Sequence, residues 1–248
     1  MSLVKDWRPG HPTLLSINNY YYRRGGADVV FLEQNRMFQE IDWNVVPFSM
    51  EHPNNLESAW SEYFVSEIEF GRQYSIGQKI VNAQKVVYSF EARSKLSKLI
   101  ADTAPNIAHM HNIYHHISPS ILGLLNSRNI PAVLTLHDLK LVCPAYKMLT
   151  HDGVCERCKP AKIHNVISHK CIKNSLPLSS LIFAEGIVHR LLRSYEKGIN
   201  RFIVPSRFYL EKMVEWGLQR ERVAYIPNFV NCDLFEPAYA PAKEVVYF

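Results

Sequence analysis

The sequence predicts an α/β protein with a Rossmann-like, doubly wound parallel sheet covered by helices on both faces. Three observations predict this fold. Short apolar runs alternate along the chain with longer segments of helical periodicity, as in right-handed β-α-β crossovers. Polar residues follow several of the apolar runs, where such folds hold their ligands. No internal repeat or low-complexity tract interrupts the alternation.

The predicted strands are apolar runs of four to six residues that are rich in β-branched side chains. In chain order they cover residues 13–18, 44–48, 107–110, 131–136, 201–204, 223–226 and 244–248.

The predicted helices show apolar residues at intervals of three and four, and two of them begin behind a serine that can cap the first turn. They cover residues 27–40, 75–88, 89–102, 118–127, 178–197 and 206–216. Residues 51–72 are predicted to form a loop with a short surface helix. Residues 143–171 show no clear period.

The composition excludes several classes of protein. The 248 residues include 28 Lys and Arg against 23 Asp and Glu, a net charge of +5 that is too small to indicate nucleic-acid binding. The amino terminus lacks the apolar core of a signal peptide. The longest stretch without a charged residue, 103–127, holds two prolines and four histidines, which a membrane-spanning helix would not tolerate. We therefore expect a cytoplasmic protein with at most a peripheral contact to the inner face of the membrane.

The end of the chain differs from the rest. Residues 227–241 are rich in proline, and the last predicted strand has no helix after it. We interpret residues 12–240 as one domain and 241–248 as a linker with the first strand of a second domain. The alternative is a last edge strand of the same sheet.

Gly25 and Gly26 stand between the first predicted strand and the first predicted helix. Glycines there allow the backbone to approach an anion, which the free N–H groups of a helix start can bind. A turn that requires a positive φ is the other interpretation. The sequence lacks the third glycine of a dinucleotide fingerprint and has no P-loop.

Polar residues also follow two later strands. His111 and Asn112 come after the run 107–110, with Tyr114 close behind. His137 and Asp138 follow the run 131–136. A histidine in this position can donate a hydrogen bond to a sugar hydroxyl or relay a proton near neutral pH. Packing beneath the loop, with Asp138 capping the next turn, is the structural alternative.

Together these segments resemble the amino-terminal domain of retaining, GT-B fold glycosyltransferases of family 4, over nearly the whole chain. The segments in register are Asn-Asn to Gly-Gly-Ala (18–27), His111-Asn112, Thr-Leu-His-Asp (135–138), Val-Pro-Ser-Arg-Phe (204–208), and Ile-Pro-Asn with Phe-Glu-Pro (226–228 and 235–237).

The resemblance implies a transfer of a hexose-type sugar from a nucleotide-sugar donor to a glycan or lipid-linked acceptor, with no cofactor for catalysis. It places Gly25 and Gly26 at the donor diphosphate and His137 at the transferred sugar. The acceptor side of the cleft would include Asn19, His111, Asn112, Tyr114, Asp138 and Ser206. The donor nucleotide belongs to the other domain of such enzymes, so we expect this chain alone not to transfer sugar.

A cysteine-rich insertion, residues 143–173, departs from the simplest form of the family. Its four cysteines, Cys143, Cys155, Cys158 and Cys171, include one Cys-x-x-Cys pair. Four thiolates suit a tetrahedral structural zinc ion, which could replace a missing apolar core. Reduced thiols or a Cys155–Cys158 disulfide are the alternatives.

Two other functions remain open at the level of the sequence. The basic insertion could be a zinc-clipped module that binds an anionic partner, such as a phosphate-bearing lipid. A GT-B-like sugar-nucleotide epimerase would share the fold.

Overall fold

The computed structural model describes residues 8–68 and 75–230, and its main element is a six-stranded parallel sheet. The strands are β1 (Thr13–Ile17), β2 (Asn44–Phe48), β3 (Ile107–Met110), β4 (Ala132–Thr135), β7 (Arg201–Val204) and β8 (Val223–Tyr225). Six of the seven predicted strands are thereby confirmed. The seventh, with the proposed domain boundary at 241, lies outside the described residues.

The strand order is β2-β1-β3-β4-β7-β8. From β1 the chain moves outward to the edge strand β2, then returns across β1 and continues in the other direction from β3. The order therefore reverses between β1 and β3. In open parallel sheets this switch point leaves a crevice at the carboxyl ends of the two strands, where ligands bind.

The helices include all six that the sequence predicts, with one of them divided in two. They are α1 (Gly26–Glu40), α2 (Ile76–Val87), α3 (Phe90–Thr103), α4 (Ile121–Ser127), α5 (Asn165–Ser168), α6 (Leu176–Leu191), α7 (Ser194–Gly198) and α8 (Arg207–Glu215). Short 3₁₀ turns lie at Ser61–Tyr63 and Arg220–Arg222. Within the described residues no helix has the length and apolar character that crossing a bilayer requires.

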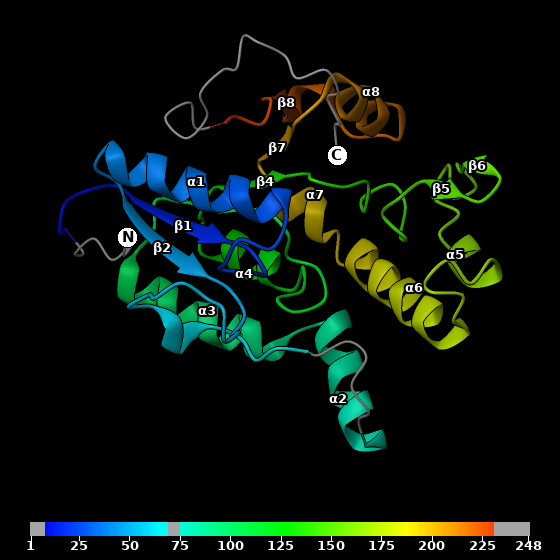
Figure 1. Cartoon of the computed structure of the whole chain (residues 1–248), viewed down its shortest axis with the longest axis horizontal. Helices are drawn as coiled ribbons and strands as arrows, with labels where there is room; N and C mark the ends of the chain where they lie inside the picture. Colours follow the sequence, from blue (N-terminus) through cyan, green and yellow to red (C-terminus); the bar gives the residue numbers. More distant parts are fainter. Residues whose placement is uncertain (1–7, 69–74, 231–248) are drawn as a thin grey trace, which may run out of the picture.

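One face of the sheet is apolar and fully buried. Side chains alternate between the faces of a strand, and the parallel register aligns Leu15 with Ala108 and Met110 with Leu134. These residues belong to one core cluster together with side chains of α3, α4 and α8, such as Leu96, Leu122 and Met213. Figure 1 shows α3 and α4 on the opposite side of the strands from α1.

The opposite face, beneath α1, is polar along its centre. Ser16 is hydrogen-bonded to Asn35 of α1, and His109 to Gln34 of the same helix at 2.8 Å. Ser16 and His109 stand side by side in the register of β1 and β3. Because α1 covers them, these groups are paired with protein atoms rather than with water.

The predicted helix over 178–197 is instead two helices, α6 and α7. Arg193 adopts a left-handed conformation with φ of 52°, which ends the first helix and turns the chain. Helical periodicity alone does not reveal such a break, because the apolar spacing continues across it. The turn brings Gly198, at the end of α7, against α4.

The insertion contains small elements that the sequence pattern did not indicate. A two-stranded antiparallel hairpin joins β5 (Leu149–Thr150) to β6 (Gly153–Val154), and the single turn of α5 follows. Gly153 has a φ of 109°, the left-handed region that favours glycine. Figure 1 shows β5, β6 and α5 at one side of the molecule, beyond α6 and α7.

A substitution at Gly198 tests the close contact between α4 and α7. A Cβ at this position would lie 2.7 Å from the Cβ of Leu122 and 3.1 Å from its carbonyl oxygen. We expect Gly198→Ala to lower the free energy of unfolding by about 1–3 kcal/mol, because a buried backbone must shift. Gly77→Ala is the matched control, since nothing lies within 4 Å of its Cβ. Urea unfolding measures both, and an equal effect of the two substitutions would contradict the contact.

Candidate functional site

The loops after β1 and β3 are hydrogen-bonded to each other at the switch point. The backbone N–H of Asn19 donates to the carbonyl oxygen of Asn112 at 2.8 Å. The N–H of Asn112 in turn donates to Oδ1 of Asn18 at 3.0 Å, and Nδ2 of Asn18 donates to Asp28 in the first turn of α1 at 2.8 Å. The two strand ends and the start of α1 are therefore joined by hydrogen bonds.

Three histidines with stacked rings connect the end of β3 to the loop after β4. The rings of His109 and His111 lie 4.8 Å apart, and those of His111 and His137 lie 5.0 Å apart, nearly parallel in both cases. His109 is also hydrogen-bonded to the Thr135 hydroxyl at 2.8 Å. Nδ1 of His111 and Nε2 of His137 are 2.7 Å apart, a direct hydrogen bond. His137 and the start of α1 thus lie on the same side of the sheet.

The hydrogen-bond network indicates which nitrogen of His137 carries the proton. Nε2 of His111 is buried without a hydrogen-bond partner among the described residues. Burying an unprotonated ring nitrogen without a partner costs less free energy than burying an unpaired N–H. We therefore infer that the proton of His111 is on Nδ1, which donates a hydrogen bond to His137. His137 then carries its own proton on Nδ1. The half-buried His137 therefore offers an N–H donor at Nδ1.

Burial keeps these histidines neutral. It lowers the pKa of His137 to about 4 and that of His109 to about 4, and it lowers the pKa of His111 well below its ordinary value. A histidine of this kind does not exchange protons near neutral pH. The lowered pKa of His137 therefore favours a hydrogen-bond donor over the proton relay that the sequence left open.

Gly25 and Gly26 form the start of α1, as the sequence predicts. Gly25 is the N-cap in an extended conformation, without a side chain to cap the helix, and Gly26 is the first helical residue. Neither has a positive φ, so the turn interpretation is wrong. Both glycines are exposed, and apart from the adjoining backbone of α1 and the chain neighbours no atom of the described residues lies within 4 Å of a Cβ built on Gly26. The space in front of the first turn is therefore open to a ligand.

The other predicted cleft residues divide into buried and accessible groups. Asn19, His111 and Tyr114 are buried, and Nδ2 of Asn19 donates to the Tyr114 carbonyl oxygen at 2.8 Å. Asn112, Asp138 and Ser206 are half-buried. The buried group thus holds the loops in shape, while direct contact with a sugar stays a prediction for all of them.

Asp138 and Ser206 already have structural roles. Oδ1 of Asp138 accepts from the Lys140 N–H at 2.9 Å, which is the turn cap that the sequence offered as an alternative. Oγ of Ser206 accepts from the Tyr209 N–H at 3.2 Å and caps α8. The hydroxyl proton of Ser206 is not used in this cap and can still be donated.

The sequence analysis missed a buried ion pair behind the His137 loop. Nζ of Lys140 lies 2.9 Å from Oε2 of Glu185 in α6, and the two side chains are only 10% and 3% exposed. Lys140 also lies over the Tyr114 ring, with Nζ 5.6 Å from its centre. The pair anchors the loop after β4 to α6. Glu185 interrupts an apolar helix, and that interruption was the signal that could have identified it.

A cavity of about 510 Å³ adjoins this ion pair. Lys140 and Glu185 line it, together with apolar side chains such as Phe202 and Trp216 and with several cationic ones. The cationic residues are Arg190, Arg193 and Arg222. Its volume falls in the range of small-molecule sites.

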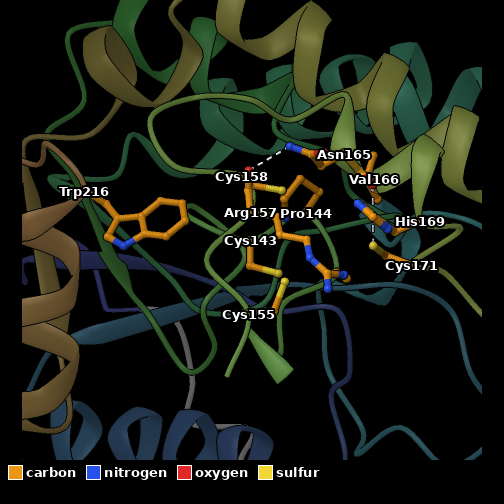
Figure 2. Close-up of a pocket in the computed structure, with 11 residues that line it drawn as sticks. Cys143, Pro144, Cys155, Arg157, Cys158, Asn165, Val166, His169, Cys171 and Trp216 are labelled. Atoms are coloured by element: carbon orange, nitrogen blue, oxygen red, sulfur yellow. Dashed lines mark hydrogen bonds between the residues drawn. The ribbon is translucent and has the colours of Figure 1, made fainter. Parts of the chain in front are cut away.

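The four cysteines of the insertion line a second, much smaller cavity of about 20 Å³, shown in Figure 2. All four thiols are free, so the Cys155–Cys158 disulfide is not formed. As arranged, no three His, Cys, Asp or Glu side chains of residues 8–68 and 75–230 form a group that could hold a metal ion.

Comparisons with known proteins identify the family and the fold of the chain. Residues 24–234 match the family model described as Glycosyltransferase Family 4. Over 64 residues, 26% of this chain, the sequence is 39% identical to an alpha-galactosylglucosyldiacylglycerol synthase of Streptococcus pneumoniae, and the match spans 17% of that protein.

The fold also resembles a solved structure, sucrose-phosphate synthase from Thermosynechococcus elongatus. The TM-score is 0.52 at 14% identity, over 92% of this chain and 50% of that one. The chain thus spans about half the length of that structure. The likeness confirms the predicted fold, a Rossmann-like domain of the GT-B kind.

The Lys140–Glu185 pair provides a test of how the His137 loop is held. We expect Lys140→Met to lower the free energy of unfolding by about 3–5 kcal/mol, because it leaves the Glu185 carboxylate buried and unpaired. Adding Glu185→Leu should restore most of the loss, since no buried charge remains. Urea unfolding of the single and double variants measures this. A loss below about 1 kcal/mol in the single variant would contradict a buried pair.

The histidine stack predicts a stability that depends on pH. The folded-state pKa of His109 is about 4, below the ordinary 6.5, so the unfolded chain binds a proton first as the pH falls. Stability should be complete above pH 6.5 and decline toward pH 4, by up to about 1.4 kcal/mol per pH unit for each such histidine. Thermal unfolding between pH 7.5 and 4.5 measures the decline.

His109→Gln should make this pH dependence shallower, because glutamine cannot be protonated. His151→Ala should not change it, since the His151 side chain is 90% exposed. Equal pH profiles for the wild type and His109→Gln would show that the stack is not the cause.

Proposed function

The chain belongs to glycosyltransferase family 4, and on this premise we propose that it forms the acceptor-side domain of an enzyme that transfers a sugar from a nucleotide-sugar donor. The acceptor is a glycan or a lipid-linked molecule. One observation carries the proposal: His137 follows β4, next to the switch point of the sheet, and a 2.7 Å hydrogen bond with His111 holds its ring there.

A neutral N–H donor suits the chemistry of this site. During glycosyl transfer the sugar hydroxyls and the departing phosphate oxygens all accept hydrogen bonds, and a donor that is already oriented stabilises charge as it develops. The His111 bond and the stacked rings restrict the imidazole of His137 to one orientation. His137 is therefore the residue that we assign to the transferred sugar.

The start of α1 is suited to the donor diphosphate. The helix dipole favours an anion there. The Asp28 N–H already donates to the Gly25 carbonyl oxygen at 3.1 Å, so a diphosphate would use the N–H groups that precede it. The exposed Gly25 and Gly26 leave this end uncovered by side chains. A diphosphate bound in front of them would lie on the same side of the sheet as His137.

The acceptor is proposed to enter from the side of the larger cavity. This cavity begins at Lys140, three residues after His137, and combines apolar walls with arginine side chains. Such a lining fits a sugar linked to a phosphate or a lipid. The name of the pneumococcal relative, a diacylglycerol glycolipid synthase, supports an acceptor of that class.

A lipid-linked acceptor lies in a membrane, so the enzyme would contact the inner face of that membrane peripherally. On α2 the side chains of Ile76, Ile80 and Val81 are exposed, on one side of the helix. Lysines in the second half of the insertion add positive charge that an anionic leaflet would attract. They are Lys162, Lys170 and Lys173.

The two other functions considered from the sequence have less support. The family match covers residues 24–234, which include every strand of the main sheet except β1, and this favours transfer over a binding module built on the insertion alone. It also favours transfer over epimerisation of a sugar nucleotide. The measurement that separates these classes is product analysis with labelled nucleotide sugars and with glycolipid or oligosaccharide acceptors.

His137 provides the sharpest test of the proposed site. In the enzyme that contains this chain, we expect His137→Ala to lower kcat by about 100-fold while leaving the KM for the acceptor nearly unchanged, because a hydrogen bond to the reacting sugar is lost. His151→Ala is the control for loss of an exposed histidine. Full activity of His137→Ala would exclude the assigned role.

His111 acts as a positioning residue, and two substitutions separate orientation from stability. His111→Gln retains an N–H that can donate to His137, whereas His111→Leu does not. The glutamine variant should retain most of kcat and the leucine variant should lose it, at similar melting temperatures. If kcat follows the melting temperature alone, His111 has only a structural role.

A further inference from the structure

We propose that the cysteine-rich insertion binds one zinc ion through Cys143, Cys155, Cys158 and Cys171, and that this ion replaces the apolar core that the insertion lacks. The site is structural and separate from the strand-end cluster. Nothing in the proposed transfer of sugar requires it.

The four thiols come from three separate parts of the insertion and meet at one cavity. Cys143 lies in the turn after the His137 loop, Cys155 and Cys158 follow the β5–β6 hairpin, and Cys171 follows α5. All four line the same cavity of about 20 Å³. Figure 2 shows the thiols of Cys143 and Cys155 pointing toward one another, and Cys171 farther away beside His169. The Cys171 thiol donates to the Asn165 carbonyl oxygen at 3.8 Å.

Apolar packing does not explain this convergence. Between residues 143 and 173 the buried hydrophobic side chains are Met148, Cys158 and Val166. A segment with so little apolar burial gains order from a metal ion, and its free thiols are available as ligands.

The small volume of the cavity favours a single metal ion over a metal cluster. About one water-sized sphere fits in it, whereas an iron–sulfur cluster would need more space. A tetrahedral set of four sulfurs suits zinc, with Zn–S distances of about 2.3 Å. Since no three of these groups already stand at such distances, binding must draw the thiols inward, Cys171 above all, because it is the exposed one.

The binding step is balanced in charge and involves no redox change. One Zn²⁺ displaces the protons of four thiols, forms four Zn–S bonds and releases four protons to the solvent. The resulting site carries a net charge of −2. The guanidinium group of Arg157 lines the same cavity and offsets part of this charge.

The ion would also stabilise the packing of the insertion against α8. Trp216, at the end of α8, lines the cavity. On the same helix, Nζ of Lys212 lies 2.6 Å from Oε1 of Glu156, and Glu215 pairs with Lys159. The cavity thus lies where the Cys155–Cys158 turn meets α8, and the ion would stabilise that contact.

The first experiment measures metal content. Protein purified without a metal-binding tag and without added metal is analysed for zinc and iron. We expect about one zinc per chain and no iron. Removal of the zinc by a chelator should lower the melting temperature, and zinc alone should restore it. Absence of both metals, or a Cys155–Cys158 disulfide found by mass analysis, would overturn the proposal.

Variants then test the ligands. Cys171→Ser should weaken zinc binding at least tenfold and change the visible spectrum of the cobalt-substituted protein, because one thiolate is lost. Cys171→His should recover most of the affinity, since imidazole also binds zinc. Cys232→Ser is the control, because this fifth cysteine lies outside the proposed ligand set. Full zinc content and an unchanged cobalt spectrum in Cys171→Ser would exclude this set of ligands.

Discussion

The parallel register of β1, β3 and β4 is the constraint on which the rest of the structure depends. It aligns Ser16 with His109 and Leu15 with Ala108, so every second residue of each strand faces the same layer. One layer is the apolar core beneath α3 and α4, and the other is a polar stripe beneath α1. A shift of one residue in any of these strands would exchange the two layers, placing histidines in the apolar core and leucines beneath α1.

The polar stripe makes the candidate site rigid, and it also lowers the stability of the folded chain. The rings of His109, His111 and His137 are stacked, and burial keeps them neutral. Buried polar groups with no partner among the described residues, such as Nε2 of His111 and Oδ1 of Asn19, are destabilising by about 1–3 kcal/mol each. Such groups are common at functional sites, where side chains are held in a fixed orientation although this lowers the stability of the fold.

The loop after β4 connects the two unusual parts of the chain. It begins with His137 at the sheet edge, is anchored to α6 through Lys140 and Glu185, and continues into the cysteine insertion. A rigid scaffold that presents functional residues on loops requires each loop to be held at more than one point. The buried ion pair is one such point, and the proposed zinc ion would be the second.

The sequence by itself determined the strands, most helix limits and the clustering of Gly26, Asn112 and His137, because periodicity and strand-end position are local properties. Only the tertiary structure decided the break at Arg193, the Glu185 partner of Lys140 and the hydrogen bond between His111 and His137. Each of these depends on segments distant in sequence that pack together, and a local pattern carries no information on which distant side chain it will meet. The meeting of the four cysteines at one cavity was likewise decided by the fold, although their residue type had already suggested zinc.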